Sequence, residues 1–345
     1  MQGLISFRTS VLAGIGTVAE TGKRLSEMGC RSCAIVSGER TMGIAGSKVA
    51  QSLEREGVAT EVISGDIRAT LGEARELEAR VRSLMPDTLV AVGGGRICDL
   101  GKWVAHRLGT RLVAVPTTLS SDAFSTGYSV LWDGERNTPV RTKPPDVIVG
   151  DYDILIHEPK RFVLAGLGDM MSKVTALFDW RLAFWLAGER YSDYGANIAR
   201  STVDLLTRRL ENIAKMNYNG IETLFLSEVT DGYLMEISGT TRVAAGSEHL
   251  FAFALENMGA EGMHGEFCAL GTVLMSYLQD PGRDVRSLFE RAGMQVTAEA
   301  LGIKKEQVVG ALTRAHRMRP WYTIMGRDGL SEGAAERLAR YTRVI

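Results

Sequence analysis

The sequence predicts an α/β protein with two parts: a doubly wound parallel sheet in the N-terminal part and an all-helical C-terminal part. Two observations carry this prediction. Short apolar runs alternate with segments of helical period up to about residue 150, whereas only helical patterns follow residue 158. We expect a domain of residues 1–155 and a domain of residues 156–345, packed closely with the site between them, because no flexible linker separates the two patterns.

The predicted strands of the first domain are short, and several are continuously apolar, as expected for strands covered on both faces of a sheet. Helical patterns lie between them. Leu77, Val81 and Leu84 recur at helical spacing, as do Val49 and Leu53. The predicted strands are Leu4–Phe7, Ala34–Val36, Thr60–Ile63, Leu89–Val92, Leu112–Val115 and Val147–Val149.

The second domain contains long helical patterns. The first of them carries acidic and basic residues among apolar ones and includes Asp169 and Lys173. The predicted helical stretches are Phe162–Leu186, Tyr194–Met216, Ile221–Ser238, Phe267–Leu278, Arg283–Ala292 and Gln307–Met318.

Composition narrows the class of protein. The chain has 345 residues, 45% of them hydrophobic and 23% charged, with a formal net charge of −1, so no basic surface for nucleic acid is indicated. No apolar run reaches the length of a membrane span, and we see no signal peptide, so we expect a cytoplasmic protein. In this setting Cys30 and Cys33 are interpreted as a reduced structural pair.

Two predicted strands end in loops suited to a dinucleotide. Gly93-Gly94-Gly95-Arg96-Ile97 lies between a buried strand and a helix through Leu108, where the backbone can approach a pyrophosphate at the helix N-terminus. Thr117-Thr118-Leu119-Ser120 follows the next strand and offers hydroxyls. The alternative for the glycine loop alone is a tight turn, and the alternative for the hydroxyl-rich loop alone is a solvated loop. The two loops together, at the ends of neighbouring strands, predict a dinucleotide. Lys102, on the helix after the glycines, is expected at the surface.

Asp169, His249 and His264 are the candidate metal ligands. One carboxylate and two imidazoles bind a first-row divalent cation well and leave a position open for substrate. His264 follows His249 by fifteen positions, so the two would come from two helices folded against each other, with Gly259 and Gly262 in the turn. Hydrogen-bonded structural histidines are the alternative.

Several short motifs follow one another along nearly the whole chain. They are Gly93-Gly94-Gly95-Arg96-Ile97-Cys98-Asp99, Val115-Pro116-Thr117, Lys143-Pro144-Pro145, Gly166-Leu167-Gly168-Asp169, Asp179-Trp180, Thr241-Arg242, Gly246-Ser247-Glu248-His249, His264-Gly265-Glu266 and Tyr322-Thr323-Ile324. Taken together and in this order, they resemble sn-glycerol-1-phosphate dehydrogenase, a family within the superfamily of iron-containing alcohol dehydrogenases, glycerol dehydrogenase and dehydroquinate synthase.

The resemblance implies a Rossmann-like N-terminal domain, a helical C-terminal domain of the dehydroquinate synthase type, and NAD(P) with one divalent metal, usually zinc, with iron or another ion as the alternative. It implies a small-molecule substrate carrying phosphate, reduction of dihydroxyacetone phosphate to glycerol 1-phosphate, and a homo-oligomer. The implied metal ligands are Asp169, His249 and His264, with Asp122 at the substrate. The implied cofactor contacts are Gly93, Gly94, Gly95, Arg96, Ile97, Thr117, Thr118, Leu119, Ser120 and Thr126.

The sequence departs from the family at the substrate. A second histidine follows the first by four residues in the family and contacts substrate, whereas Phe253 occupies this position here. Phenylalanine neither donates a hydrogen bond nor carries charge. The family's His-Asp-Gly loop is also altered, to Ser121-Asp122-Ala123. The residues expected at the cofactor and the metal are thus retained, whereas those expected at the substrate have changed.

The cations that we expect at a substrate phosphate are Lys173 and Arg242. At the cofactor ribose, Glu39 and Arg40 follow the second strand, and the carboxylate favours NAD, with NADP possible.

The predicted reaction is metal-assisted hydride transfer between a nicotinamide and a small ketone or secondary alcohol. Three alternatives stay open at the level of sequence. One is a dehydrogenase for another polyol, sugar or cyclitol phosphate, which Phe253 favours. The others are a cyclase like dehydroquinate synthase that uses NAD transiently, and a nucleotide-binding sensor without catalysis, against which the Asp-His-His set argues.

Overall fold

The computed structural model describes residues 9–345, so the strand predicted at Leu4–Phe7 lies outside the described residues. The chain forms two compact units, Met1–Pro159 and Lys160–Ile345. No helix in the described part is long and apolar enough to cross a membrane.

Unit 1 is built on a six-stranded sheet in the order β1-β8-β5-β4-β2-β3, with every neighbouring pair parallel. The other five strands of this sheet, β2, β3, β4, β5 and β8, coincide with predicted strands. Strand β1 was missed because its side chains alternate between half-buried and exposed. The strands are β1 (Ser10–Gly14), β2 (Ser32–Gly38), β3 (Ala59–Gly65), β4 (Thr88–Gly93), β5 (Arg111–Pro116) and β8 (Val147–Asp151).

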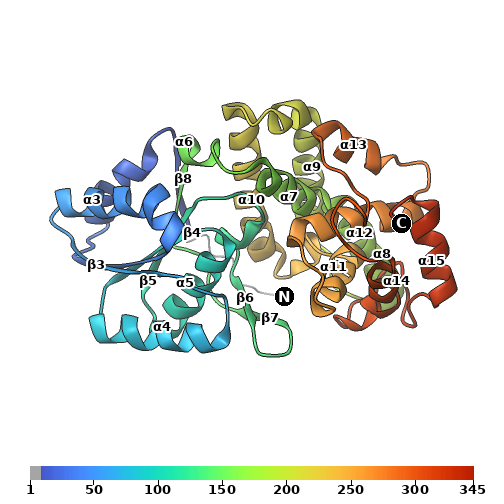
Figure 1. The fold of residues 1–345 in the computed structure, drawn as a ribbon, viewed down its shortest axis with the longest axis horizontal. Coiled ribbons are helices and arrows are strands. Elements are labelled where there is room, and N and C mark those ends of the chain that lie inside the picture. Colours follow the sequence, from blue (N-terminus) through green and yellow to red (C-terminus); the bar gives the residue numbers. More distant parts are fainter. Residues whose placement is uncertain (1–8) are drawn as a thin grey trace. The chain divides into compact units, whose positions relative to one another are not determined.

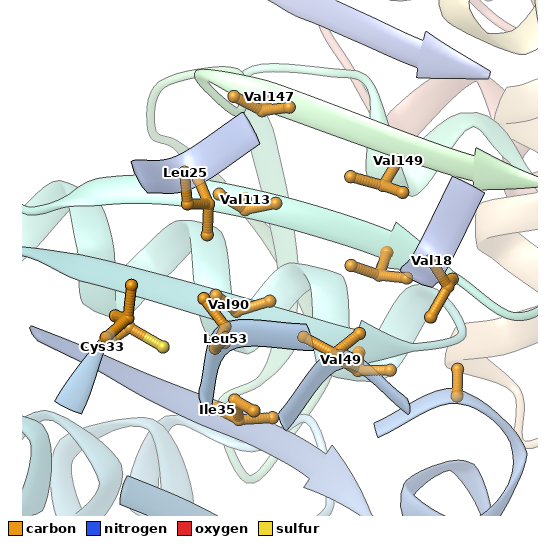
Figure 2. Close-up of a cluster of buried hydrophobic side chains, with 14 of the residues drawn as sticks. Val18, Leu25, Cys33, Ile35, Val49, Leu53, Val90, Val113, Val147 and Val149 are labelled. Carbon is orange, nitrogen blue, oxygen red and sulfur yellow. The ribbon is translucent and has the colours of Figure 1, made fainter. Parts of the chain in front are cut away.

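Helices cover both faces of this sheet (Figure 1). The helices α1 (Thr21–Glu27) and α3 (Ser47–Arg55) pack on one face, and α4 (Leu71–Leu84) and α5 (Gly95–Leu108) pack on the other. Successive strand residues point to opposite faces, so Ile35 and Val90 join the first core while Ala34 and Leu89 join the second. Figure 2 shows the first core, in which valines of strands β4, β5 and β8 lie with Ile35 of β2 against Leu25, Val49 and Leu53.

The remaining elements of unit 1 connect these layers. A hairpin of β6 (Tyr128–Trp132) and β7 (Asn137–Arg141) is antiparallel and was not predicted. The short helical elements are η1 (Thr17–Glu20), α2 (Glu39–Thr41), η2 (Met42–Gly46), η3 (Asp122–Phe124) and α6 (Tyr152–Leu155).

Unit 2 is helical in its described secondary structure, as predicted. Its longest helices form an antiparallel pair with recognisable ends: Ser192 and Asn217 accept hydrogen bonds from backbone N–H groups at the N-termini, and Gly239 ends the second helix with positive φ. The helices are α7 (Lys160–Met171), α8 (Lys173–Ala187), α9 (Asp193–Ala214), α10 (Tyr218–Ser238), α11 (Ser247–Asn257), α12 (His264–Gln279), α13 (Val285–Ala292), α14 (Lys305–Arg314) and α15 (Glu332–Tyr341), with short turns η4 (Thr241–Val243) and η5 (Ala315–Arg317).

Three of these helices approach one another more closely than side chains permit. A Cβ at Gly168 of α7 would lie 2.2 Å from the carbonyl oxygen of Gly265 in α12, and a Cβ at Gly265 would lie 1.8 Å from that of Ala165. A Cβ at Gly271 would lie 2.7 Å from the oxygen of Glu248 in α11. Glycine is therefore required at these crossings, and the residues beside it are held at fixed positions.

Candidate functional site

The glycine-rich loop lies where the strand order of unit 1 reverses. The chain passes from β2 to β3 on one side and then returns to β4 on the other side of β2. In open parallel sheets, ligands bind beyond the carboxyl ends of the strands at such a point. Ser37 near the end of β2 is in register with Val92, and its Oγ donates a hydrogen bond of 2.9 Å to the Val92 oxygen. The loop that starts at Gly93 therefore occupies the expected crevice.

The three glycines allow this turn to form. A Cβ at Gly93 would lie 2.7 Å from the Ile97 side chain, and one at Gly94 would lie 2.9 Å from Thr118 Oγ1. Helix α5 starts at Gly95, and its first backbone N–H groups and positive dipole end favour an anion. Arg96 is exposed on its first turn. These features suit a pyrophosphate.

The hydroxyl-rich loop lies beside the glycines. The backbone N–H of Thr117 donates to the Gly93 oxygen at 3.1 Å. Thr117 Oγ1 is buried and has no hydrogen-bond partner among the described residues. The Leu119 N–H donates to both carboxylate oxygens of Glu158, at 3.2 and 2.9 Å. Burial raises the pKa of Glu158 to about 8, against the opposing effect of this hydrogen bond. The loop is thus tied at two points while one hydroxyl is left for a ligand.

The other predicted residues of unit 1 lie close to these loops in sequence. Asp122 is half-buried in the turn η3, and Thr126 is 4% exposed just after it. Lys102 was expected at the surface, and this was wrong: its side chain is fully buried, lies 2.9 Å from Asp99 and donates to the Tyr128 carbonyl. The ammonium group of Lys102 is therefore paired inside unit 1.

In unit 2, the three predicted metal ligands converge, together with one cysteine that was not predicted. Ligand atoms of Asp169, His249, His264 and Cys268 all lie within 4.8 Å of one another. His249 Nε2 is 3.3 Å from Asp169 Oδ1, and Cys268 Sγ is 3.4 Å from His264 Nε2. The convergence of these side chains follows from the close crossing of α7 and α12, because Asp169 follows Gly168 and His264 precedes Gly265.

Carboxylates outside the cluster orient both imidazoles. Glu248 Oε1 is 2.9 Å from His249 Nδ1, and Glu256 Oε1 is 2.7 Å from His264 Nδ1. A carboxylate accepts hydrogen bonds only, so in the neutral, metal-binding form of each imidazole the Nδ1 atom would carry the proton and the Nε2 lone pair would face the cluster. Glu248 is itself fixed, since it accepts from the Gly246 N–H and from Thr175 Oγ1. This carboxylate–histidine arrangement is common around protein-bound metals.

The electrostatics of the cluster favour a cation. Burial alone would lower the pKa of His249 and His264, yet Cys268 and the neighbouring carboxylates raise both well above the ordinary value. Burial would raise the pKa of Asp169, but His249, His264 and Lys173 lower it to about 2. The raised pKa values of both imidazoles and the ionised Asp169 carboxylate mean that the cluster attracts positive charge, which a divalent ion would supply in place of protons on the two Nε2 atoms. The residues present therefore fit a divalent metal ion.

Phe253 lies beside the cluster, one turn after His249 on α11. Its ring stacks on His264 with centroids 5.6 Å apart and meets His249 edge-on at 6.0 Å. The Arg319 guanidinium lies 4.8 Å from the centre of the Phe253 ring. The substitution thus brings an aromatic wall, and a cation upon it, to the edge of the metal site.

Lys173 and Arg242, the predicted phosphate ligands, are both enclosed in the helical unit. Lys173 Nζ lies 2.8 Å from Asp231, and both side chains are 1% exposed. Arg242 is 3% exposed, pairs with Glu189 at 3.2 Å and donates to the Tyr322 carbonyl at 2.7 Å. Lys173 is thus paired with a buried carboxylate and Arg242 with a half-buried one.

Sequence reasoning missed Glu256, Cys268 and Arg319. Cys268 follows His264 by one helical turn, so helical spacing could have placed it on the same face. Glu256 and Arg319 reach the site only through the fold, and no local pattern marks them.

Comparison with known proteins gives a consistent family. Residues 12–159 match the family described as iron-containing alcohol dehydrogenase. A protein of Hyperthermus butylicus named glycerol-1-phosphate dehydrogenase, NAD(P)+, is 38% identical over 99% of both chains, and one of Pyrococcus abyssi with the same name is 33% identical over 99% of both.

Solved structures support the same fold. A probable glycerol dehydrogenase from Sinorhizobium meliloti 1021 superposes with a TM-score of 0.79 at 21% identity, covering 97% of this chain and 98% of the other. Glycerol dehydrogenase from Schizosaccharomyces pombe gives 0.78 at 21% identity, covering 99% and 90%. With relatives 38% and 33% identical over 99% of both chains, the chain belongs to the glycerol-1-phosphate dehydrogenase family of iron-containing alcohol dehydrogenases.

Proposed function

We propose that the protein is a metal-dependent, NAD(P)-linked dehydrogenase that interconverts dihydroxyacetone phosphate and sn-glycerol 1-phosphate. The observation that carries the proposal is the convergence of Asp169, His249 and His264 within one cluster, in a chain of this family. When bound, the metal would supply Lewis acidity at the substrate oxygen, and the dinucleotide would supply or accept the hydride.

The chain's own residues bind and orient the cofactor and the metal ligands. In unit 1 the Gly93–Gly95 turn and the start of α5 hold the pyrophosphate, and the buried Thr117 hydroxyl donates to the cofactor. Exposed Glu39 after β2 favours NAD through the ribose hydroxyl, and Arg40 beside it allows NADP. In unit 2, Glu248 and Glu256 keep the imidazole protons on Nδ1 so that both Nε2 atoms stay available as ligands.

We assign the anionic end of the substrate to Arg319 because of its place beside the metal cluster, whereas Lys173 and Arg242 are enclosed in ion pairs with Asp231 and Glu189. Arg319 is half-buried over the Phe253 ring at the edge of the metal cluster. Guanidinium binds phosphate through paired N–H donors, and stacking on a ring preorganises it. Zinc is the metal that we favour, with iron as the alternative.

Phe253 supports a second candidate, a dehydrogenase of another polyol, sugar or cyclitol phosphate. Its ring occupies space next to both metal-site imidazoles and offers no hydrogen bond. A hydroxyl-rich substrate would lose a polar contact there, whereas one with an apolar edge would gain a surface.

A substrate panel tests the proposal. Oxidation of NADH and NADPH is followed at fixed metal with dihydroxyacetone phosphate, unphosphorylated dihydroxyacetone, other ketose phosphates and cyclitol ketones. We expect the highest kcat/KM with dihydroxyacetone phosphate, and loss of turnover in His264→Ala but not in His106→Ala, whose side chain is exposed on α5. Turnover of a substrate with no net change in NADH would instead favour a cyclase, and oxidation of neither nucleotide would contradict dehydrogenase function.

A further inference from the structure

We propose that Cys268 is a fourth protein ligand of the metal, which makes the site a mixed imidazole, carboxylate and thiolate centre selective for zinc. The proposal rests on the metal site of the proposed function and extends it, since the family resemblance implied three ligands with oxygen and nitrogen donors only.

The position of Cys268 is dictated by helix geometry. It lies four residues after His264 in α12, so both side chains project from the same face one turn apart. The residue is 0% exposed, and its Sγ is 3.4 Å from His264 Nε2. The sulfur is thus buried against the very atom that the metal would use.

The distances agree with the edges of a tetrahedral site. Metal bonds of about 2.0–2.1 Å to nitrogen or oxygen and about 2.3 Å to sulfur give ligand separations of about 3.3 Å between nitrogen and oxygen, and about 3.5 Å between nitrogen and sulfur. The separations found are 3.3 Å for His249 Nε2 and Asp169 Oδ1 and 3.4 Å for His264 Nε2 and Cys268 Sγ. All four ligand atoms lie within 4.8 Å of one another, so the longer separations would shorten when an ion is bound.

A purely structural role for the thiol conflicts with a metal at His264. The Nδ1 proton of His264 faces Glu256, so its Nε2 lone pair is the acceptor available to the S–H group. When the metal takes that lone pair, the thiol loses this acceptor and its sulfur faces a divalent cation. Release of the thiol proton to solvent and formation of a metal–sulfur bond resolve both problems.

The thiolate changes which metal ion the site prefers. Soft sulfur ligands raise the preference for zinc over harder ions, whereas a carboxylate and two imidazoles also suit iron. Cys268 therefore acts as a specificity ligand for the metal, distinct from the three residues that hold any divalent ion. Cys268 would thus hold the ion together with Asp169, His249 and His264, and the bound ion would supply Lewis acidity to the substrate oxygen.

X-ray absorption at the zinc edge tests this on the full-length zinc enzyme without any variant. One sulfur neighbour at about 2.3 Å is the expected result, and a shell of only nitrogen and oxygen at about 2.0–2.1 Å would overturn the proposal. That second result would leave a three-ligand, metal-dependent dehydrogenase intact. Failure of the protein to retain zinc at all would overturn the metal part of the proposed function as well.

Cobalt substitution supplies a second readout with matched variants. The cobalt enzyme should show a near-ultraviolet sulfur-to-cobalt charge-transfer band that disappears in Cys268→Val while the visible d–d bands persist. Cys30→Ser removes another buried thiol, in unit 1, and should keep the band. In zinc–iron competition, Cys268→Val should shift the bound ratio toward iron by roughly 10–100-fold, the scale seen for changes around metal sites. An unchanged band or ratio in Cys268→Val would contradict a metal–sulfur bond.

Discussion

Replacing Gly168 with alanine tests how tightly the helix crossing controls the metal site. The added Cβ would lie 2.2 Å from the Gly265 carbonyl oxygen, whereas ordinary contacts start near 3.4 Å. The obstacle is backbone, so α7 and α12 must separate by roughly 1 Å. Metal sites tolerate ligand displacements of about 0.2 Å. Asp169 is the next residue along α7, so the substitution should move it out of bonding range.

Stability and metal affinity should both fall. Alanine in a helix interior gains about 1 kcal/mol over glycine, but overpacking costs about 1–3 kcal/mol and more for an unyielding backbone clash. We expect a net loss of about 1–2 kcal/mol, which lowers the melting temperature of a unit of this size by about 2–8 °C.

Calorimetry and zinc competition with a chromophoric chelator measure the two effects. Gly282→Ala is the matched control in the same unit, because its added Cβ would meet only the Asp280 side chain at an ordinary 3.5 Å. Wild-type melting temperature and zinc affinity in Gly168→Ala would refute the argument that the crossing positions Asp169.

Three further predictions concern single side chains. The pKa of Glu158 is about 8 in the fold against 4.5 when unperturbed, so its stabilising effect is complete below about pH 4.5 and is lost as pH rises through 8. Glu158→Gln should therefore flatten the pH dependence of the melting temperature in this window, and an unchanged slope would count against it. Glu256→Gln should weaken zinc binding by roughly 10–100-fold in a chelator titration, while Glu261→Gln, in an exposed loop, should not. Arg319→Leu should lower kcat/KM for a ketose phosphate by about 10–100-fold, the scale of one charged hydrogen bond, with little change for the unphosphorylated ketone; equal losses for both would remove phosphate from its role.

Repeating local patterns explain which parts of the fold were predictable. Buried parallel strands such as Leu89–Val92 and Leu112–Val115 are continuous apolar runs, and the long helices carry periodic apolar faces. Strand β1 was missed because only alternate side chains are covered, and the β6–β7 hairpin has just two short strands. The break at Ser172 was missed because both flanking segments are strongly helical; its hydroxyl donates to the Asp169 carbonyl at 2.5 Å.

The site was predictable where chemistry sits beside a recognisable motif. Asp169, His249 and His264 were found in this way, and the structure gathers them. The enclosure of Lys173 and Arg242, which we expected at a substrate phosphate, was not predictable, because their ion pairs arise from contacts between segments distant in the sequence.

The most direct measurement is a zinc titration of the metal-stripped enzyme, with NADH oxidation by dihydroxyacetone phosphate followed at each step. The account predicts turnover that rises in proportion to zinc and saturates at one ion per chain, and no recovery in Asp169→Asn or His264→Ala. Full turnover in the stripped enzyme, or equal recovery in these variants, would contradict a metal held by Asp169, His249 and His264.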